Sequence, residues 1–186
     1  MSRQWLLARE LEEQALGGEE IAIRNVGPEG LRLIRQYGLV PYSFERSHIN
    51  NGAVLIKKIK LLREQNNDKE VLYSRLKDLL PRFTVVDYNP LEKNAKGFFY
   101  YYSMRYSPTQ FAESVMYRIY YDWYAYNGDK KRGEKFVLDD RDNKMQYEYV
   151  NISYKEMYEK VVASVKSGHA VYWEYGENHS SGHAMA

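Results

Sequence analysis

The sequence contains no cysteine. A chain without cysteine has neither a disulfide framework nor a thiol nucleophile. No apolar run approaches about 18 residues, so no membrane-spanning helix is expected. The first residues, MSRQWLLARELEEQ, carry acids where a signal peptide would be apolar. These absences predict a cytoplasmic protein with no membrane partner.

Neither sign of charge dominates the chain. The 27 Lys and Arg residues nearly balance the 25 Asp and Glu residues, for a formal net charge of +2. The basic residues alternate with acids, so the basic stripe that is typical of nucleic-acid-binding proteins is missing. We therefore expect no nucleic-acid partner.

The chain has 186 residues, of which 44% are hydrophobic and 28% are charged, and this composition indicates a globular domain. Helical signals dominate the first half, and extended segments and helices are mixed afterwards. Because no βαβα alternation is present, the order of elements favours the α+β class. The predicted helices cover residues 5–16, 28–37, 53–64 and 72–79, and the first predicted strands cover 83–88 and 98–106.

The second half contains two capping boxes, which start at Ser107 and Ser153. The first predicts a helix that carries Phe111, Val115, Ile119 and Trp123 at helical spacing. The second predicts a helix that Gly168 ends, followed by a strand over 169–175 and a last strand that starts at His183. The polar segment 127–144 is predicted to be a surface loop.

The four histidines differ in their sequence setting. His48 is predicted to lie on the surface, and His169 is predicted to start a strand. His179 and His183 have an H-x3-H spacing, but Ser-Ser-Gly separates them, so we expect a turn rather than a helical metal site. No metal or cofactor is therefore expected. Small residues flank His183, which would leave its imidazole accessible as a general base.

Four stretches together resemble the papain-like cysteine peptidases, and in particular the bleomycin hydrolase and aminopeptidase C branch. The stretches are NVGPEG followed by LRLIRQYGLVP, SPTQFAESV, YVNISYKEMYEKVVASVKSGHAVYW, and GHAMA at the end. Their order along the chain carries the resemblance more than any one of them does.

The resemblance implies one papain-like domain over 1–186 that is incomplete at its ends. Its mainly helical lobe would cover 1–80, its mixed, sheet-rich lobe would cover 81–186, and a cleft would separate them. The family hydrolyses peptide bonds with a cysteine thiolate, a histidine and an asparagine, so the resemblance implies a peptide substrate. Relatives in this branch assemble into homo-oligomers, so the resemblance also implies a possible homo-oligomer. His183 falls on the general-base position, and Gly27, Glu29 and Gly30 fall on substrate-binding backbone.

The chain departs from the family at the nucleophile. Arg3-Gln4-Trp5 is similar to the start of the family's nucleophile helix, where cysteine precedes tryptophan, although the interval from Trp5 to Gly27 is shorter than in the family. Ser2 lies in a terminal segment that is expected to be disordered, so a serine replacement is not expected. The orienting asparagine would follow residue 186. Two interpretations follow. Either this is a partial chain, with the nucleophile or the asparagine region missing or replaced, or it is a degenerate relative that kept the fold and lost the chemistry. Both predict no peptidase activity from these residues alone.

A different class of function is compatible with the tyrosine content. The chain has 19 tyrosines, many of them in residues 98–126. With Asp122, Asn127 and Asp129, these rings would suit a non-catalytic peptide- or glycan-binding module. Alternatively, the helical spacing of Phe111, Val115, Ile119 and Trp123 makes this segment part of the core.

Overall fold

The computed structural model describes residues 1–23, 27–92, 95–116, 123–138, 146–169, 171–178 and 181–185, with the backbone alone for 174–178 and 181–185. The described residues form α-helices and small β-sheets, which confirms the α+β class. The chain divides into two compact units. Met1–Arg24 and Gly30–Ile119 form unit 1, and Asn25–Glu29 and Tyr120–Ala186 form unit 2.

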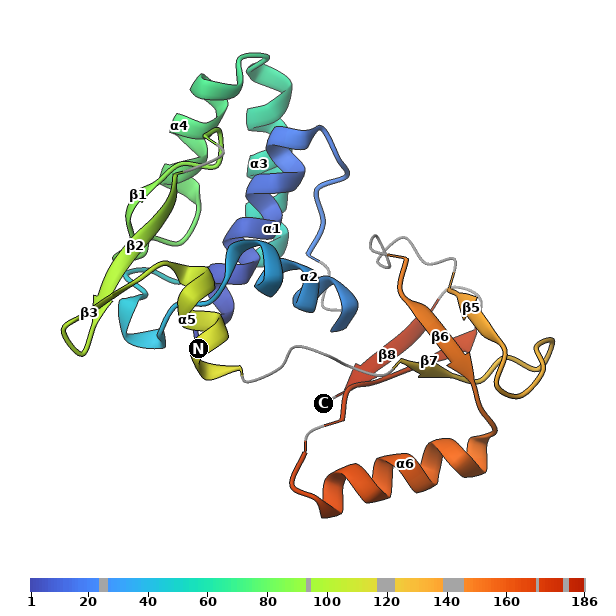
Figure 1. Cartoon of the computed structure of the whole chain (residues 1–186). Helices are drawn as coiled ribbons and strands as arrows, with labels where there is room; N and C mark the ends of the chain where they lie inside the picture. Colours follow the sequence, from blue (N-terminus) through green and yellow to red (C-terminus); the bar gives the residue numbers. More distant parts are fainter. Residues whose placement is uncertain are drawn as a thin grey trace. The chain divides into compact units, whose positions relative to one another are not determined.

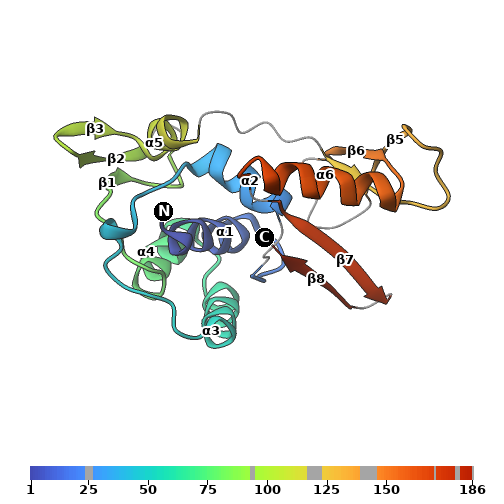
Figure 2. The same cartoon turned by 90° about the horizontal axis from the view of Figure 1, so that it is seen from below.

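Helices make up most of unit 1, and the four that the sequence predicts between residues 5 and 79 are confirmed. Figures 1 and 2 show α1 lying against α3 and α4. The helices are α1 (Arg3–Gly17), α2 (Gly27–Tyr37), α3 (Gly52–Gln65), α4 (Lys69–Leu79) and α5 (Pro108–Val115), with a short 3₁₀ helix η1 (Tyr42–Phe44).

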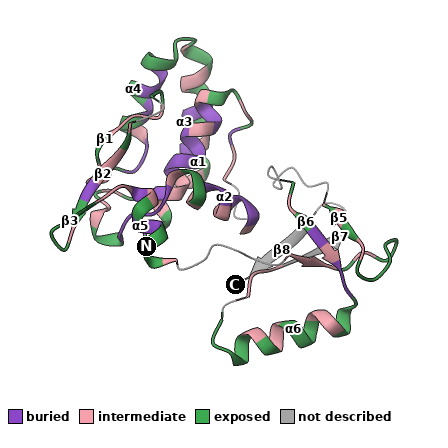
Figure 3. Cartoon of the chain, viewed as in Figure 1, coloured by how far each residue is buried: buried purple, intermediate pink, exposed green. Residues whose placement is uncertain are grey.

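A cluster of buried apolar residues joins α1, α3 and α4. It contains Ala8, Leu11, Ala15, Ile21, Leu55, Ile59, Leu72, Leu76 and Leu80. Figure 3 shows α1 buried along most of its length. Burial of apolar surface contributes about 25 cal/mol per Å², so this cluster stabilises the packing of the three helices.

An antiparallel sheet completes unit 1, with the order β1 (Val86–Tyr88), β2 (Lys96–Tyr101), β3 (Met104–Tyr106). The predicted strand 83–88 is shorter than expected, because Phe83 forms an isolated bridge with Glu45 and packs on Trp5. The predicted extended segment 98–106 is a hairpin. Its turn residues Tyr102 and Ser103 have φ of 46° and 62°, as a two-residue type I′ turn requires.

The two faces of this hairpin have different environments. Phe99, on one face, is 1% exposed and contacts Phe111 of α5 at a ring distance of 5.5 Å. It belongs to a second core cluster with Trp5, Leu39, Val40, Phe111 and Ala112. On the other face, Tyr100 pairs with Arg105 and is 61% exposed. The alternation of a strand therefore separates a core face from a solvent face.

Helix α5 begins at the predicted capping box but is shorter than predicted. The Ser107 hydroxyl accepts from the Gln110 amide, and the Gln110 side chain accepts from the Ser107 amide. The helix ends at Val115, and Ile119 lies outside the described residues. Trp123 is not helical, because its carbonyl accepts the Val150 amide beside strand β4 (Tyr124–Ala125).

Unit 2 contains a sheet with the order β4, β6 (Glu148–Asn151), β5 (Lys135–Val137). β4 runs parallel to β6, and β5 runs antiparallel to it. The prediction of a loop over 127–144 is therefore wrong for β5, whose Phe136 pairs with Tyr149 on β6. Strands β7 (Trp173–Asn178) and β8 (Ser181–Met185) form a separate antiparallel hairpin.

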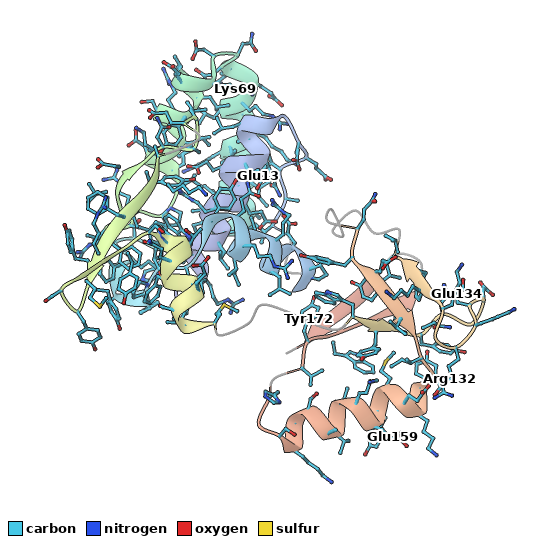
Figure 4. All side chains as sticks on the ribbon, viewed as in Figure 1. Glu13, Lys69, Arg132, Glu134, Glu159 and Tyr172 are labelled. Atoms are coloured by element: carbon cyan, nitrogen blue, oxygen red, sulfur yellow. The ribbon has the colours of Figure 1, made fainter. Side chains whose placement is uncertain are left out.

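Helix α6 (Tyr154–Lys166) lies beside the strands of unit 2 and starts at the second capping box, as predicted (Figure 1). Gly168 has φ of 78°, and the His169 amide donates to the Ser164 carbonyl, so His169 is part of the helix cap. β7 begins at Trp173, and the prediction of a strand from His169 is wrong. Arg132, labelled in Figure 4, lies close to α6. It forms an ion pair with Glu156 of that helix.

Candidate functional site

His183, the predicted general base, lies in β8, where its backbone is opposite Tyr175 of β7. Its side chain is outside the described part of the structure, and so is the whole of His179. The two histidines of the Gly-His-Ala stretches lie in different local structures, because His169 follows α6 and His183 lies within a strand. The described residues contain no group of three or more possible metal ligands.

The predicted substrate-binding residues Gly27, Glu29 and Gly30 come together in the first turn of α2. Glu29 is 1% exposed, so its carboxylate is not at the surface. At Gly30 a Cβ atom would meet no neighbour within 4 Å. The position therefore has room for an approaching backbone, and the role of these three residues in substrate binding stays a prediction.

The first turn of α1 is more ordered than the sequence predicted. Ser2 is 1% exposed and caps the helix, because its hydroxyl accepts the Trp5 amide at 3.1 Å. Its own amide donates to the Val40 carbonyl at 3.0 Å. The expectation that Ser2 is disordered is therefore wrong, and the reason is the cap that it provides for a buried helix.

Ser2 also donates its hydroxyl to Oε2 of Glu45 at 2.8 Å, and Oε1 of Glu45 contacts Nδ1 of His48. The carboxylate thus stands between the serine and the histidine. In a serine hydrolase the histidine contacts the serine and takes its proton. This order of contacts does not activate Ser2 as a nucleophile. The side chain of His48 is 54% exposed, which confirms its predicted surface location.

Gln4 is the second residue of α1, and Trp5 follows it into the core. Oε1 of Gln4 accepts the Ile49 amide at 3.1 Å. Trp5 is 1% exposed, and its indole N–H donates to the Tyr37 carbonyl at 3.3 Å. An amide side chain therefore lies at the N-terminal end of a buried helix, where the partial positive charge of the helix would stabilise an anion.

A buried group of charged residues lies one turn further along α1. The Arg9 guanidinium is 4.5 Å from the Trp5 ring and 4.0 Å from the Tyr88 ring. Its Nη1 is 3.3 Å from Oε2 of Glu12, which also accepts the Tyr88 hydroxyl at 2.7 Å. Burial raises the pKa of Glu12, against the opposing effect of Arg9 and of the Tyr88 hydrogen bond.

The neighbouring Glu13 has its own partners. Arg32 binds its two carboxylate oxygens at 3.1 and 2.9 Å, and the Tyr37 hydroxyl donates to Oε2 at 3.1 Å. Burial and the Glu13 charge raise the pKa of Tyr37, so this phenol stays protonated at neutral pH. These networks could not be predicted from the sequence, because Tyr88, Arg32 and Tyr37 reach the glutamates of α1 from distant positions along the chain.

The comparisons with known proteins identify no family. No family model matches the sequence, and a search of the curated proteins found no match. Within the described residues, no helix is both long and apolar enough to cross a membrane. The functional interpretation therefore depends on the residues themselves.

Proposed function

We propose that this chain is a relative of the papain-like cysteine peptidases, of the bleomycin hydrolase and aminopeptidase C type, that has lost the nucleophile. The observation that carries the proposal is the start of α1. Gln4 and the buried Trp5 stand in the first turn of a buried helix, where the family has cysteine and tryptophan. An amide cannot replace a thiolate as a nucleophile, so this chain alone does not hydrolyse peptide bonds.

The other stretches that resemble the family support the same proposal. GPEGLRLIRQY forms α2, and SPTQFAESV forms α5 with its cap. SYKEMYEKVVASVK forms α6 with its cap, and GHAM lies in β8. In the family the histidine pairs with the nucleophile, so the proposal pairs His183 with position 4. A peptide would bind along the backbone at Gly30, where a Cβ would meet no neighbour within 4 Å, whereas the Tyr172 ring already covers Gly27.

The experiment restores the thiol with Gln4→Cys. Because the chain has no cysteine, alkylation by iodoacetamide then reports on one thiol. A thiol at a helix N-terminus beside a protonated histidine has a pKa well below the usual value of about 8.5. We expect the rate of alkylation to titrate below about pH 7.5 in this variant, and to titrate at higher pH when His183→Ala is added.

Lys155→Cys is the matched control, since Lys155 is the second residue of α6 and is exposed. It measures the effect of a helix N-terminus alone. If the thiol at position 4 titrates like the thiol at position 155 and does not respond to His183→Ala, the papain-like pairing is wrong. The unmodified chain should release no product from fluorogenic aminoacyl amides, and measurable turnover would contradict the loss of the nucleophile.

A second candidate is a non-catalytic peptide- or glycan-binding module that uses the tyrosine-rich segment 98–126. The exposure of Tyr100 and of Tyr102, at 61% and 86%, favours it. Phe99 and Phe111 of the same segment are buried, so the segment is part core and part surface. Asp122 lies outside the described residues, and Asn127 uses its side chain to accept the Asp129 amide. A lowered thiol pKa that depends on His183 supports the first candidate over this one.

A further inference from the structure

A cavity of about 360 Å³ opens beside the β1–β2–β3 sheet of unit 1. It is lined by Asp87, Ala95, Lys96, Gly97, Phe98, Arg105 and Ser107, and we call it the hairpin pocket. Figure 1 shows β1, β2 and β3, the strands that supply most of its lining residues. Its volume falls in the range of small-molecule sites, which is roughly 300–1,000 Å³.

Arg105 is held in place without using its hydrogen-bond donors. Its guanidinium carbon lies 4.0 Å from the centre of the Phe98 ring. Register pairs Arg105 with Tyr100, so Arg105 and Phe98 are diagonal neighbours on one face of the hairpin. Among the described residues Arg105 has no hydrogen bond and no ion pair. A guanidinium that is stacked in this way presents a flat fork of N–H donors, which fits a carboxylate.

The backbone that forms the pocket has an unusual conformation. Gly97 has φ of 74°, and a Cβ there would lie 2.6 Å from Val85 and 2.9 Å from Tyr88. Asp87, on the neighbouring strand, has φ of 55°, which is costly for a residue with a side chain. These two residues keep the strands close and bring Lys96, Phe98 and Asp87 to the same cavity.

The charges in the pocket favour a ligand with one negative charge. Lys96 and Arg105 attract an anion, and Asp87 repels a second negative charge. No ion pair among the described residues joins Asp87 to either cation. A carboxylate carries one charge at neutral pH, whereas a phosphate monoester carries nearly two.

A neighbouring cavity of about 220 Å³ shares Ala95 and Lys96 with the hairpin pocket but offers fewer free groups. The hydroxyls of Tyr37 and Tyr88, which line it, already donate to Glu13 and Glu12. Among the residues that line these two cavities, the cations are Arg105 and Lys96.

We propose that the hairpin pocket binds a carboxylate group of a small molecule or peptide through Arg105 and Lys96, with Asp87 selecting against doubly charged anions. The carboxylate can come from the end of a peptide or from an acidic side chain, and both present the same flat group. The proposal does not depend on the peptidase relationship.

The experiment follows the amide signal of Gly97 by ¹H–¹⁵N NMR in the full chain during titration with small probes. N-acetyl-L-phenylalanine carries a terminal carboxylate, and the α-amide of N-acetyl-L-glutamic acid carries a side-chain carboxylate. N-acetyl-L-phenylalaninamide carries none, and phenyl phosphate carries a dianion. We expect each of the two carboxylate probes to shift the Gly97 amide signal saturably. The probe that binds more tightly identifies whether the natural carboxylate is a chain end or an acidic side chain. The amide and the phosphate probes should bind at least tenfold more weakly.

Arg105→Gln should weaken carboxylate binding by about tenfold or more, because a charge-assisted pair of hydrogen bonds is lost. Arg82→Gln is the control, since Arg82 is a 68% exposed arginine of the same unit, and it should change affinity by less than about twofold. Asp87→Asn keeps a residue that tolerates positive φ and should let phenyl phosphate bind. Equal binding of acid and amide, or an unchanged affinity in Arg105→Gln, would overturn the proposal.

Discussion

The two compact units are stabilised in different ways. Unit 1 has two clusters of buried apolar side chains, and most of α1 is inaccessible to solvent. Beyond residue 122, the described residues that are buried are Tyr149, Asn151 and Ile152, and none of the side chains of α6 is buried. Among the side chains of unit 2 that the structure describes, hydrogen bonds, ion pairs and ring contacts are therefore more prominent than apolar burial.

Asn151 illustrates the second kind of stabilisation. It is 3% exposed, and its Nδ2 donates to the carbonyls of Asn127 and Lys130 at 3.0 and 2.7 Å. Its Oδ1 accepts the Asn127 amide at 2.8 Å. One amide side chain thus orders the loop before β5. Because regions with few buried apolar contacts open most easily, we expect unit 2 to exchange its amide hydrogens faster than α1 does.

The largest expected effect tests the apolar core of unit 1. Leu76 in α4 is fully buried, and Leu76→Ala should lower the free energy of unfolding by about 2–5 kcal/mol. Val165 in α6 is 60% exposed, so Val165→Ala should change it by less than about 0.5 kcal/mol. Urea unfolding of both variants measures the difference. An equal loss of unfolding free energy in the two variants would mean that α6 is packed as firmly as α4, and would contradict the difference between the two units.

A smaller effect tests the hydrogen bonds of unit 2. Asn151→Ala leaves the carbonyls of Asn127 and Lys130 without their donor, and we expect a cost of about 1–3 kcal/mol. Asn127→Ala is the control, because its side chain accepts only the exposed Asp129 amide. Hydrogen exchange should accelerate in β6 for the first variant and leave α1 unchanged. Accelerated exchange in α1 would show that the units do not open separately.

The smallest expected effect concerns how stability depends on pH. The contribution of Glu12 in unit 1 and that of Glu156 in unit 2 should change with pH in opposite directions. Burial raises the pKa of Glu12 above its ordinary value of 4.5, so the folded state holds this proton more tightly than the unfolded state does. The contribution of Glu12 to stability is therefore present below pH 4.5 and is lost as the pH rises through its folded pKa.

Glu156 in unit 2 behaves in the opposite way. Its hydrogen bonds to Arg132, and then to the amide and hydroxyl of Ser153, lower its pKa from 4.5 to about 2. Its contribution is present above pH 4.5 and is lost as the pH falls towards 2. The measurement is the urea midpoint of Glu12→Gln and of Glu156→Gln, each compared with the unmodified chain from pH 2 to 7. The difference from the unmodified chain should change with pH in opposite directions for the two variants. Parallel slopes would contradict the assignment of one buried and one exposed carboxylate.

The sequence alone determined the local elements of both units. Apolar periodicity predicted α1 to α4, and the capping boxes at Ser107 and Ser153 predicted where α5 and α6 begin. These signals are reliable because helix formation and capping depend on residues within a few positions of one another. The exposed location of His48 and the C-terminal cap at Gly168 followed from the same local reasoning.

The tertiary structure decided what distant segments do together. β5 lies in a polar stretch that looked like a loop, and only its pairing with β6 makes it a strand. Trp123 fits a helical pattern, but its carbonyl pairs with β6. Of the candidate site residues, Gly27, Glu29 and Gly30 come together as neighbours in α2, whereas Ser2 meets Glu45 across 43 positions.

Burial of charge was likewise invisible in the sequence. Arg9 and Glu12 lie in a helix that the sequence predicts, but their burial follows from the fold, in which the rings of Trp5 and Tyr88 pack against the Arg9 guanidinium and the Tyr88 hydroxyl bonds to Glu12. Arg105, Lys96 and Asp87 stay exposed, but the fold brings them from three strands to one pocket. Strand pairing and the burial of ionised groups depend on partners far along the chain, so composition and spacing do not specify them.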